Sequence, residues 1–279
     1  MVRRGRWASE RVVTESPLVR RLLIGTAMVF LTVFLFVPLV AVFVNALRAG
    51  VGAYATSVAD QGTRQAIGLT LLVAAIAVPL NLVFGLAAAW LIAKFSFRGK
   101  GAMVTLIDLP FSISPVIAGL VFVLLFGRQG MLGPWLLGRG VQIVFAVPGI
   151  VLATIFVTLP FIAREVLAQM QTQGSEEEEA ALTLGAGGWR MFWSITVPKV
   201  RWSLLYGIVL CNARAMGEFG AVSVVSGHIR GETITVPLQV EILYNEYQFV
   251  AAFAVASLLT LLALLTLAAR RFVEARSAR

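Results

Sequence analysis

The chain has 279 residues, of which 59% are hydrophobic and only 13% are charged, and its formal net charge is +9. Soluble domains average about 45–50% apolar and about 25% charged residues, so this composition excludes a soluble globular domain and predicts an all-α polytopic membrane protein. The positive charge does not predict nucleic acid as a partner, because the basic residues form no dense cluster and such residues near span ends set membrane topology.

Six stretches are long and apolar enough to cross about 30 Å of hydrocarbon as helices, and we expect membrane lipid to surround them. The first follows an Arg-rich tail, 1–21, and is too long to be the apolar region of a cleaved signal peptide. The spans form a transmembrane domain over 22–269, which a short tail, 270–279, follows. The expected spans are about 22–47, 66–93, 102–126, 141–162, 203–226 and 249–269.

The third expected span contains two prolines, Pro110 and Pro115, with Ser112 and Ser114 between them. Each proline removes a backbone hydrogen bond, which predicts a kink or a locally unwound segment. Such a break is tolerated only against protein or a wet cavity, so Ser112 and Ser114 are candidates for lining a pore. A kink that serves packing alone explains the pattern equally well.

The basic residues predict how the spans are oriented. By the positive-inside rule, the side with more Lys and Arg faces the cytoplasm. Five basic residues lie in the three connections of one side, and seventeen lie in the segments of the other, which are 1–21, 94–101, 163–202 and 270–279. Both termini and the segment 163–202 are therefore expected in the cytoplasm, which agrees with an even number of spans.

The longest charged interruption, 175–198, contains four consecutive glutamates. Ser175 and Glu178 match a capping box, and the glutamates fill a first helical turn, where negative charge is favourable. Gly185 predicts the end of this helix, and the aromatic stretch 189–193 predicts a second short helix at an angle to the first. A solvated amphipathic linker explains the same charges without a partner.

The same segment resembles the EAA loop of ABC importer permeases. The matching residues are Glu179, Ala180, Ala181, Gly185, Ile195 and Pro198, and Val197 stands where the family pattern has leucine. The resemblance implies a type I ABC importer permease fold in which this loop forms coupling helices that sit in a groove of an ATP-hydrolysing subunit. It also implies that this contact is carried by Glu178, Glu179, Ala180, Ala181, Leu184, Gly185, Ile195 and Pro198.

The stretch 212–244 resembles the sulfate and molybdate type of these permeases, and 216–220 and 226–231 are most similar to the W subunit of the sulfate/thiosulfate importer. The likeness implies a multi-pass protein of the bacterial inner membrane. The partners that it implies are a T-type sulfate permease subunit, two copies of an ABC ATPase and an extracytoplasmic sulfate/thiosulfate-binding protein. Molybdate or another oxyanion remains the alternative cargo.

Arg214 and Glu218 stand four residues apart in the fifth expected span, hence on one helical face. Ionisable residues inside a membrane indicate function, and an Arg214 that faces the path would favour a dianion such as sulfate, with Glu218 tempering its charge. Ser223 and Ser226 continue this polar face and would donate hydrogen bonds to an anion. A pair that neutralises itself for structural reasons is the other interpretation.

The chain has no G-x-x-x-x-G-K-[ST] phosphate loop, so we expect a transport subunit rather than an enzyme, with ATP and Mg²⁺ bound by the partner ATPase. The lone histidine, His228, and the lone cysteine, Cys211, make neither a metal site nor a catalytic triad, and we expect no cofactor in this chain. A stand-alone secondary transporter is less favoured, because that class shows repeated halves and this sequence shows none.

Overall fold

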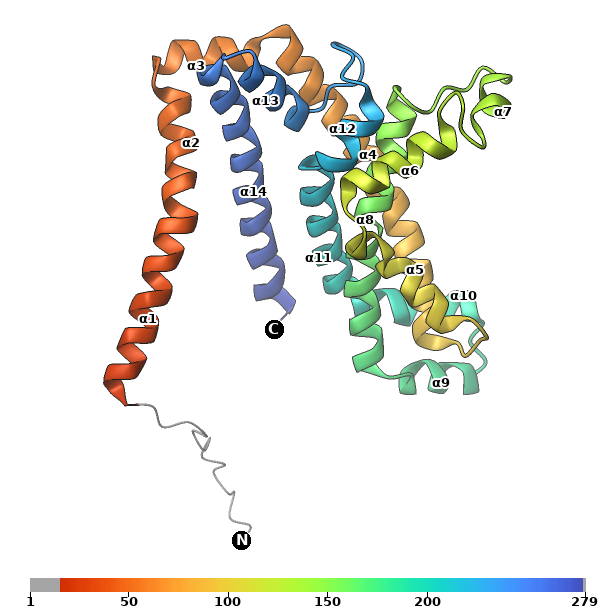
Figure 1. Ribbon diagram of the computed structural model, residues 1–279. Coiled ribbons are helices and arrows are strands. Elements are labelled where there is room, and N and C mark those ends of the chain that lie inside the picture. Colours follow the sequence, from red (N-terminus) through yellow and green to blue (C-terminus); the bar gives the residue numbers. More distant parts are fainter. Residues whose placement is uncertain (1–15, 278–279) are drawn as a thin grey trace.

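The computed structural model describes residues 16–277, the side chains of 267 and 269–277 excepted, and all regular elements in this part of the chain are helices (Figure 1). The expected all-α architecture is thereby confirmed. Most of the expected N-terminal tail, residues 1–15, lies outside the described residues. The elements are α1 Pro17–Leu31, η1 Thr32–Phe36, α2 Val37–Leu47, α3 Gly50–Ala59, α4 Gln61–Lys94, α5 Lys100–Ser112, α6 Pro115–Phe126, α7 Gly133–Leu137, α8 Val147–Gln173, α9 Glu176–Thr183, α10 Gly188–Met191, η2 Phe192–Thr196, α11 Val197–Met216, α12 Gly220–Ser226, α13 Val236–Asn245 and α14 Phe249–Ser277.

Within the described residues, four helices are long and apolar enough to cross a membrane, and two bent helix pairs raise the number to six if each pair is one span. The pair α5 and α6 is bent by 109° at the prolines, and the pair α11 and α12 by 49°. The kink expected between Pro110 and Pro115 is therefore present, and it is far sharper than a kink within one continuous helix. The third and fifth expected spans are broken rather than straight.

The fourth expected span is displaced along the chain. The helix α8 begins at Val147 rather than at 141, because Pro148 occupies its first turn, where the missing N–H costs nothing. It then continues to Gln173, past the apolar stretch, and ends at Gly174, whose positive φ of 69° does not fit a helix.

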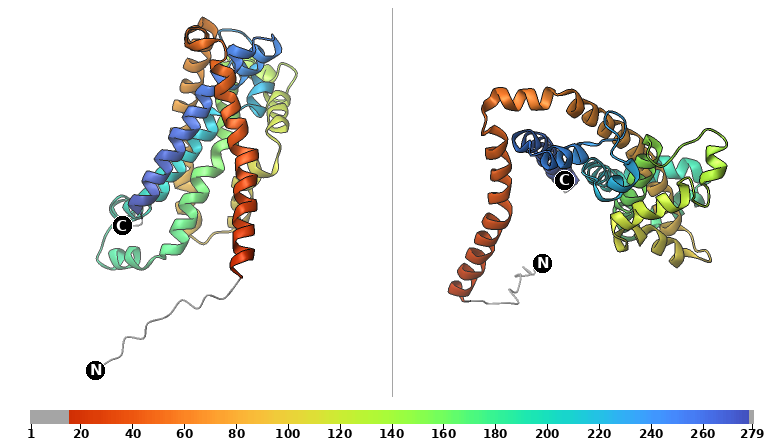
Figure 2. Two further views of the ribbon diagram at one scale, coloured as in Figure 1. Left: turned by 90° about the vertical axis from the view of Figure 1, so that its left-hand side faces the viewer. Right: turned by 45° about the horizontal axis from the view of Figure 1, so that its top comes forward.

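The first three elements form a rod that stands apart from the rest of the chain (Figures 1 and 2). None of the residues of α1 is buried. Only the part of the rod nearest α3 is covered, where α2 packs against α14. The helix α3 lies across the end of the molecule and joins this rod to α4.

At the centre of the body α8 packs against both α4 and α11, and these helices approach closely where they carry glycine. A Cβ atom at Gly85 would lie 3.0 Å from the amide nitrogen of Ala163, and one at Gly207 would lie 3.1 Å from the Cα atom of Ile162. Small residues permit such close packing between membrane helices, where van der Waals contact replaces the hydrophobic effect as the driving force.

The two bent pairs pack against each other through α6 and α12. A Cβ atom at Gly119 would lie 2.7 Å from the carbonyl oxygen of Ala221 and 2.9 Å from the Cβ atom of Val224. The contact thus depends on the missing side chain at Gly119. The short helices α9 and α10 lie at one end of the molecule, and α3 and α13 lie at the opposite end (Figure 1).

Candidate functional site

The helix α9 is built as the sequence predicts at both ends. Its first turn holds four glutamates, whose charges complement the partial positive charge of a helix N-terminus. At its other end Gly185 has a φ of 83°, the Gly185 amide donates to the Leu182 carbonyl over 3.0 Å, and the Ala186 amide donates to the Ala181 carbonyl over 2.9 Å. This pair of hydrogen bonds is a Schellman motif, which confirms that Gly185 ends the helix.

The expected capping box at the start of α9 is wrong. Ser175 occupies the cap position, but its side chain accepts no hydrogen bond from the helix. Its hydroxyl instead donates to the Glu179 carboxylate. The reciprocal bond from Glu178 is absent because that side chain faces the body of the protein.

Glu178 is only 5% exposed, and both of its oxygens have partners in other elements. The Lys94 Nζ atom, at the end of α4, lies 2.8 Å from Oε2, and the Thr196 hydroxyl donates to Oε1 over 3.1 Å. A second ion pair joins Glu177 to Lys199 over 3.1 Å. The carboxylate of Glu178 therefore holds α9 against α4 and η2 rather than facing outward.

Most of the other residues expected to carry the coupling contact are exposed. Five of the exposed residues on or just after α9 define what we call the α9 surface, namely Glu179, Ala180, Leu184, Gly185 and Trp189. Leu184 is 88% exposed and Trp189 is 73% exposed, so this surface is apolar in part. Pro198 is also exposed, whereas Ala181 and Ile195 are half-buried.

The expected second short helix does not stand alone, because α10, η2 and α11 form one continuous helix, Gly188–Met216. Pro198 has no N–H, and its ring clashes with the carbonyl four residues back in a regular helix. The wider π-helical turn Phe192–Thr196 comes directly before this position and relieves that clash. The element η1 precedes Pro38 in the same way.

Arg214 and Glu218 form an ion pair, with 2.8 Å between Nη1 and Oε2. The Glu218 side chain is 1% exposed, the Arg214 side chain is 34% exposed, and Glu218 Oε1 accepts a hydrogen bond from the Ala221 amide over 3.0 Å. The expectation that both residues share a helical face is wrong, since α11 ends at Met216 and Glu218 lies in the break before α12. The pair therefore bridges the 49° bend, and the Arg214 side chain stays partly exposed.

The four serines proposed for the path lie in two different settings, two at the bend between α5 and α6 and two within α12. Ser112 and Ser114 are exposed where α5 meets α6. Ser223 donates its hydroxyl to the Gly220 carbonyl over 2.9 Å, and Ser226 is fully buried and accepts from the His228 amide over 3.3 Å. The structure thus gives Ser223 and Ser226 partners within the chain.

A further ion pair joins Asp108 in α5 to Arg164 in α8. The Arg164 Nε atom lies 2.6 Å from Oδ1, and Nη2 donates to Oδ2 over 2.9 Å, so the contact is bidentate. The Arg164 side chain is nevertheless 56% exposed. The sequence gives no sign of this pair, or of Lys94 with Glu178, because each joins residues far apart in the chain.

Residues 81–279 match the family model described as the inner membrane component of binding-protein-dependent transport systems. The chain belongs to this family of transport permeases, and the expectations of an ABC importer permease and of a multi-pass inner-membrane protein are confirmed.

Its relatives give the subfamily. The sulfate transport system permease protein CysW of Escherichia coli K12 is 51% identical over 91% of this chain and 87% of its own. The sulfate transport system permease protein CysT of the same strain is 33% identical over 92% of this chain and 92% of its own. A crystal structure of a bacterial alginate ABC transporter with its alginate-bound periplasmic protein contains a chain of the same fold, with a TM-score of 0.78 at 20% identity over 94% of this chain and 95% of that one.

Proposed function

We propose that this chain is the W-type permease subunit of an ATP-driven importer for sulfate or thiosulfate. The likeness to CysW supports the cargo, since about half of the residues are identical over nine-tenths of the chain. The observation that carries the role as a coupled subunit is the α9 surface, which is exposed while the buried Glu178 fixes the helix beneath it. An importer for molybdate or another oxyanion is the alternative.

The proposed assembly contains a T-type permease, two copies of an ABC ATPase and an extracytoplasmic binding protein. The 33% identity to CysT supports a pair of related permease chains that enclose a central path. ATP and Mg²⁺ would bind to the ATPase, because this sequence has no phosphate loop. The α9 surface would sit in a groove of that subunit.

In this proposal the end that carries α9 lies in the cytoplasm. The start of α1 and the end of α14 both point toward the same end as α9, as an even number of crossings requires (Figure 1). The transmembrane domain then spans 22–269, and the loop 175–198 is its coupling element. The excess of basic residues in the corresponding tails and connections supports this orientation.

In the proposed mechanism the continuous helix Gly188–Met216 transmits movement of the ATPase to the membrane. Closure of the ATPase pair on ATP would move the α9 surface and, with it, this helix, whose far end carries Arg214. The partly exposed Arg214 side chain would attract a dianion, while the buried Glu218 fixes its position and lowers the net charge of the site. A lower net charge prevents the anion from being held too tightly to leave.

Uptake of radiolabelled sulfate, with and without this chain in cells that lack their own sulfate permease, tests the cargo. We expect uptake to depend on the chain and to be competed by thiosulfate more strongly than by molybdate. Uptake of molybdate without uptake of sulfate would move the assignment to the alternative. Co-purification in detergent tests the coupling, and an extracted chain that brings down no ATPase would contradict it.

A further inference from the structure

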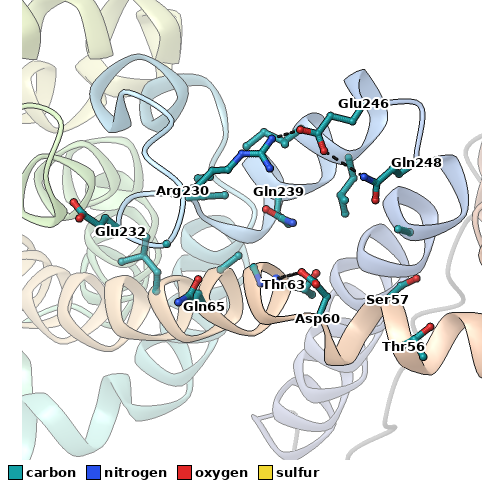
Figure 3. Close-up of a pocket in the computed structure, with 18 residues that line it drawn as sticks. Thr56, Ser57, Asp60, Thr63, Gln65, Arg230, Glu232, Gln239, Glu246 and Gln248 are labelled. Atoms are coloured by element: carbon teal, nitrogen blue, oxygen red, sulfur yellow. Dashed lines mark hydrogen bonds and ion pairs between the residues drawn. The ribbon is translucent and has the colours of Figure 1, made fainter.

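A polar recess of about 470 Å³ opens at the end of the molecule opposite α9 (Figure 3). It lies between the start of α4, the helix α13 and the loop that precedes α13. The lining residues that matter here are Asp60, Thr63, Arg230, Glu232, Gln239 and Glu246. None of them belongs to the α9 surface or to the Arg214 site.

The recess is acidic in a chain whose formal net charge is +9. Arg230 is the single basic residue among those that line it, and it forms an ion pair with Glu246. Asp60 and Glu232 are two further acidic residues of the lining, and the Glu232 carboxylate points away from Asp60 (Figure 3). Asp60 Oδ2 accepts from the amides of Gly62 and Thr63, which leaves Oδ1 for another donor.

One buried polar group in the wall also lacks a partner. Thr63 is 1% exposed, and its hydroxyl has no hydrogen-bond partner within the described part of the chain. The Gln239 side chain is 8% exposed and points into the recess (Figure 3). A buried polar group without a partner costs about 1–3 kcal/mol, so a donor that enters the recess would recover part of this cost.

The kind of occupant follows from these groups. No three His, Cys, Asp or Glu residues among those described are placed to hold a metal ion. A dianion would be repelled by Asp60 and Glu232. An ammonium or guanidinium group, by contrast, supplies both positive charge and several N–H donors.

We propose that this recess receives a lysine or arginine side chain of the extracytoplasmic binding protein. The inference rests on the proposed function, which places this end of the chain outside the cytoplasm. Carboxylates at an interface attract a basic partner over a distance and fix its orientation, so the recess would set how the binding protein docks.

The test uses the complete transporter in nanodiscs, with ATP hydrolysis measured against the concentration of cargo-loaded binding protein. In the double variant Asp60→Asn with Glu232→Gln, asparagine keeps the capping acceptor of α4 while both charges are lost. We expect the half-maximal concentration to rise about tenfold at low salt, the difference to shrink at about 0.5 M salt, and the maximal rate to stay unchanged. The matched control is Glu241→Gln, which removes a carboxylate that pairs with His228 and does not line the recess.

A second measurement locates the contact without relying on charge. Cys211 is fully buried and is the only cysteine of the chain, so Glu232→Cys introduces the one accessible thiol of this chain, and labelling is read on this chain after the subunits are separated. We expect the binding protein, but not serum albumin, to slow its reaction with a maleimide.

An unchanged half-maximal concentration in the double variant, or unchanged labelling while the binding protein still stimulates hydrolysis, would overturn this inference and leave the proposed function standing. A wild-type transporter that the binding protein does not stimulate would instead overturn the proposed function, and this inference with it.

Discussion

The Lys94 ammonium lies 2.8 Å from the Glu178 carboxylate, although 84 residues separate them in the chain. Their side chains are 12% and 6% exposed, so water screens the pair little. The contact joins the last turn of α4 to the first turn of α9. A membrane-spanning helix thereby fixes the position of the α9 surface.

Replacement of Glu178 by alanine should release α9 from the body. Removal of one partner from a buried ion pair costs about 3–5 kcal/mol, because the other charge stays buried without compensation. We expect amide hydrogen exchange in α9 to rise and ATPase co-purification to fall. Glu177→Ala is the control, since Glu177 is 66% exposed and its pair with Lys199 contributes at most about 1 kcal/mol. Equal effects of the two variants would contradict this assignment.

Replacement of Gly185 by alanine should weaken coupling to the ATPase, because it strains the backbone at the end of α9 without a steric clash. Gly185 has a φ of 83°, and a Cβ atom there meets nothing within 4 Å. The left-handed conformation costs an L-residue about 1–2 kcal/mol, so we expect sulfate uptake to fall several-fold. Gly187→Ala is the control, because Gly187 has equally open surroundings but a φ of −68°, which alanine adopts without strain. Uptake should be unchanged in that control.

Arg214→Ala should lower both the abundance of the protein and its transport, since it leaves the buried Glu218 carboxylate unpaired. The double variant with Glu218→Gln separates the two effects. We expect abundance in the membrane to return because no unpaired charge remains, while sulfate uptake stays at least tenfold below wild type. Recovery of uptake together with abundance would show that the pair serves structure only.

Gly119→Ala should separate α6 from α12. The added methyl group would lie 2.7 Å from the Ala221 carbonyl oxygen, which belongs to backbone that cannot rotate away. Overpacking of this kind costs about 1–3 kcal/mol, and we expect a lower melting temperature of the detergent-purified transporter. Gly68→Ala is the matched helical control, because a Cβ atom there meets nothing within 4 Å. A melting temperature that falls equally in both variants would count against a specific contact at Gly119.

Local chemistry made much of this molecule predictable from the sequence. Apolar length predicted the helices, the two prolines predicted the break between α5 and α6, and Gly185 predicted the end of α9. The first feature depends on the composition of one continuous stretch, and the other two depend on residues within about one helical turn.

The errors and omissions have a common cause in contacts between distant segments. The capping box failed because Lys94 and Thr196 bind the Glu178 carboxylate, which a local pattern does not show. The break after Met216 is stabilised by Glu218, which looks like a residue of a continuous helix when only spacing is considered. The recess at the opposite end combines residues from two distant parts of the chain, 56–69 and 230–251, so no local motif predicts it.

The unbroken helix Gly188–Met216 has a mechanical consequence. At 1.5 Å per residue it is a lever about 43 Å long, with aromatic side chains at one end and Arg214 near the other. A tilt of about 5° imposed at Gly188 moves the far end by about 4 Å, more than the length of the ion pair that Arg214 makes there. The wide turn at Phe192–Thr196 is the one place along this helix where the hydrogen-bond pattern changes. The stiffness of this turn therefore sets how much of the displacement at Gly188 reaches Arg214.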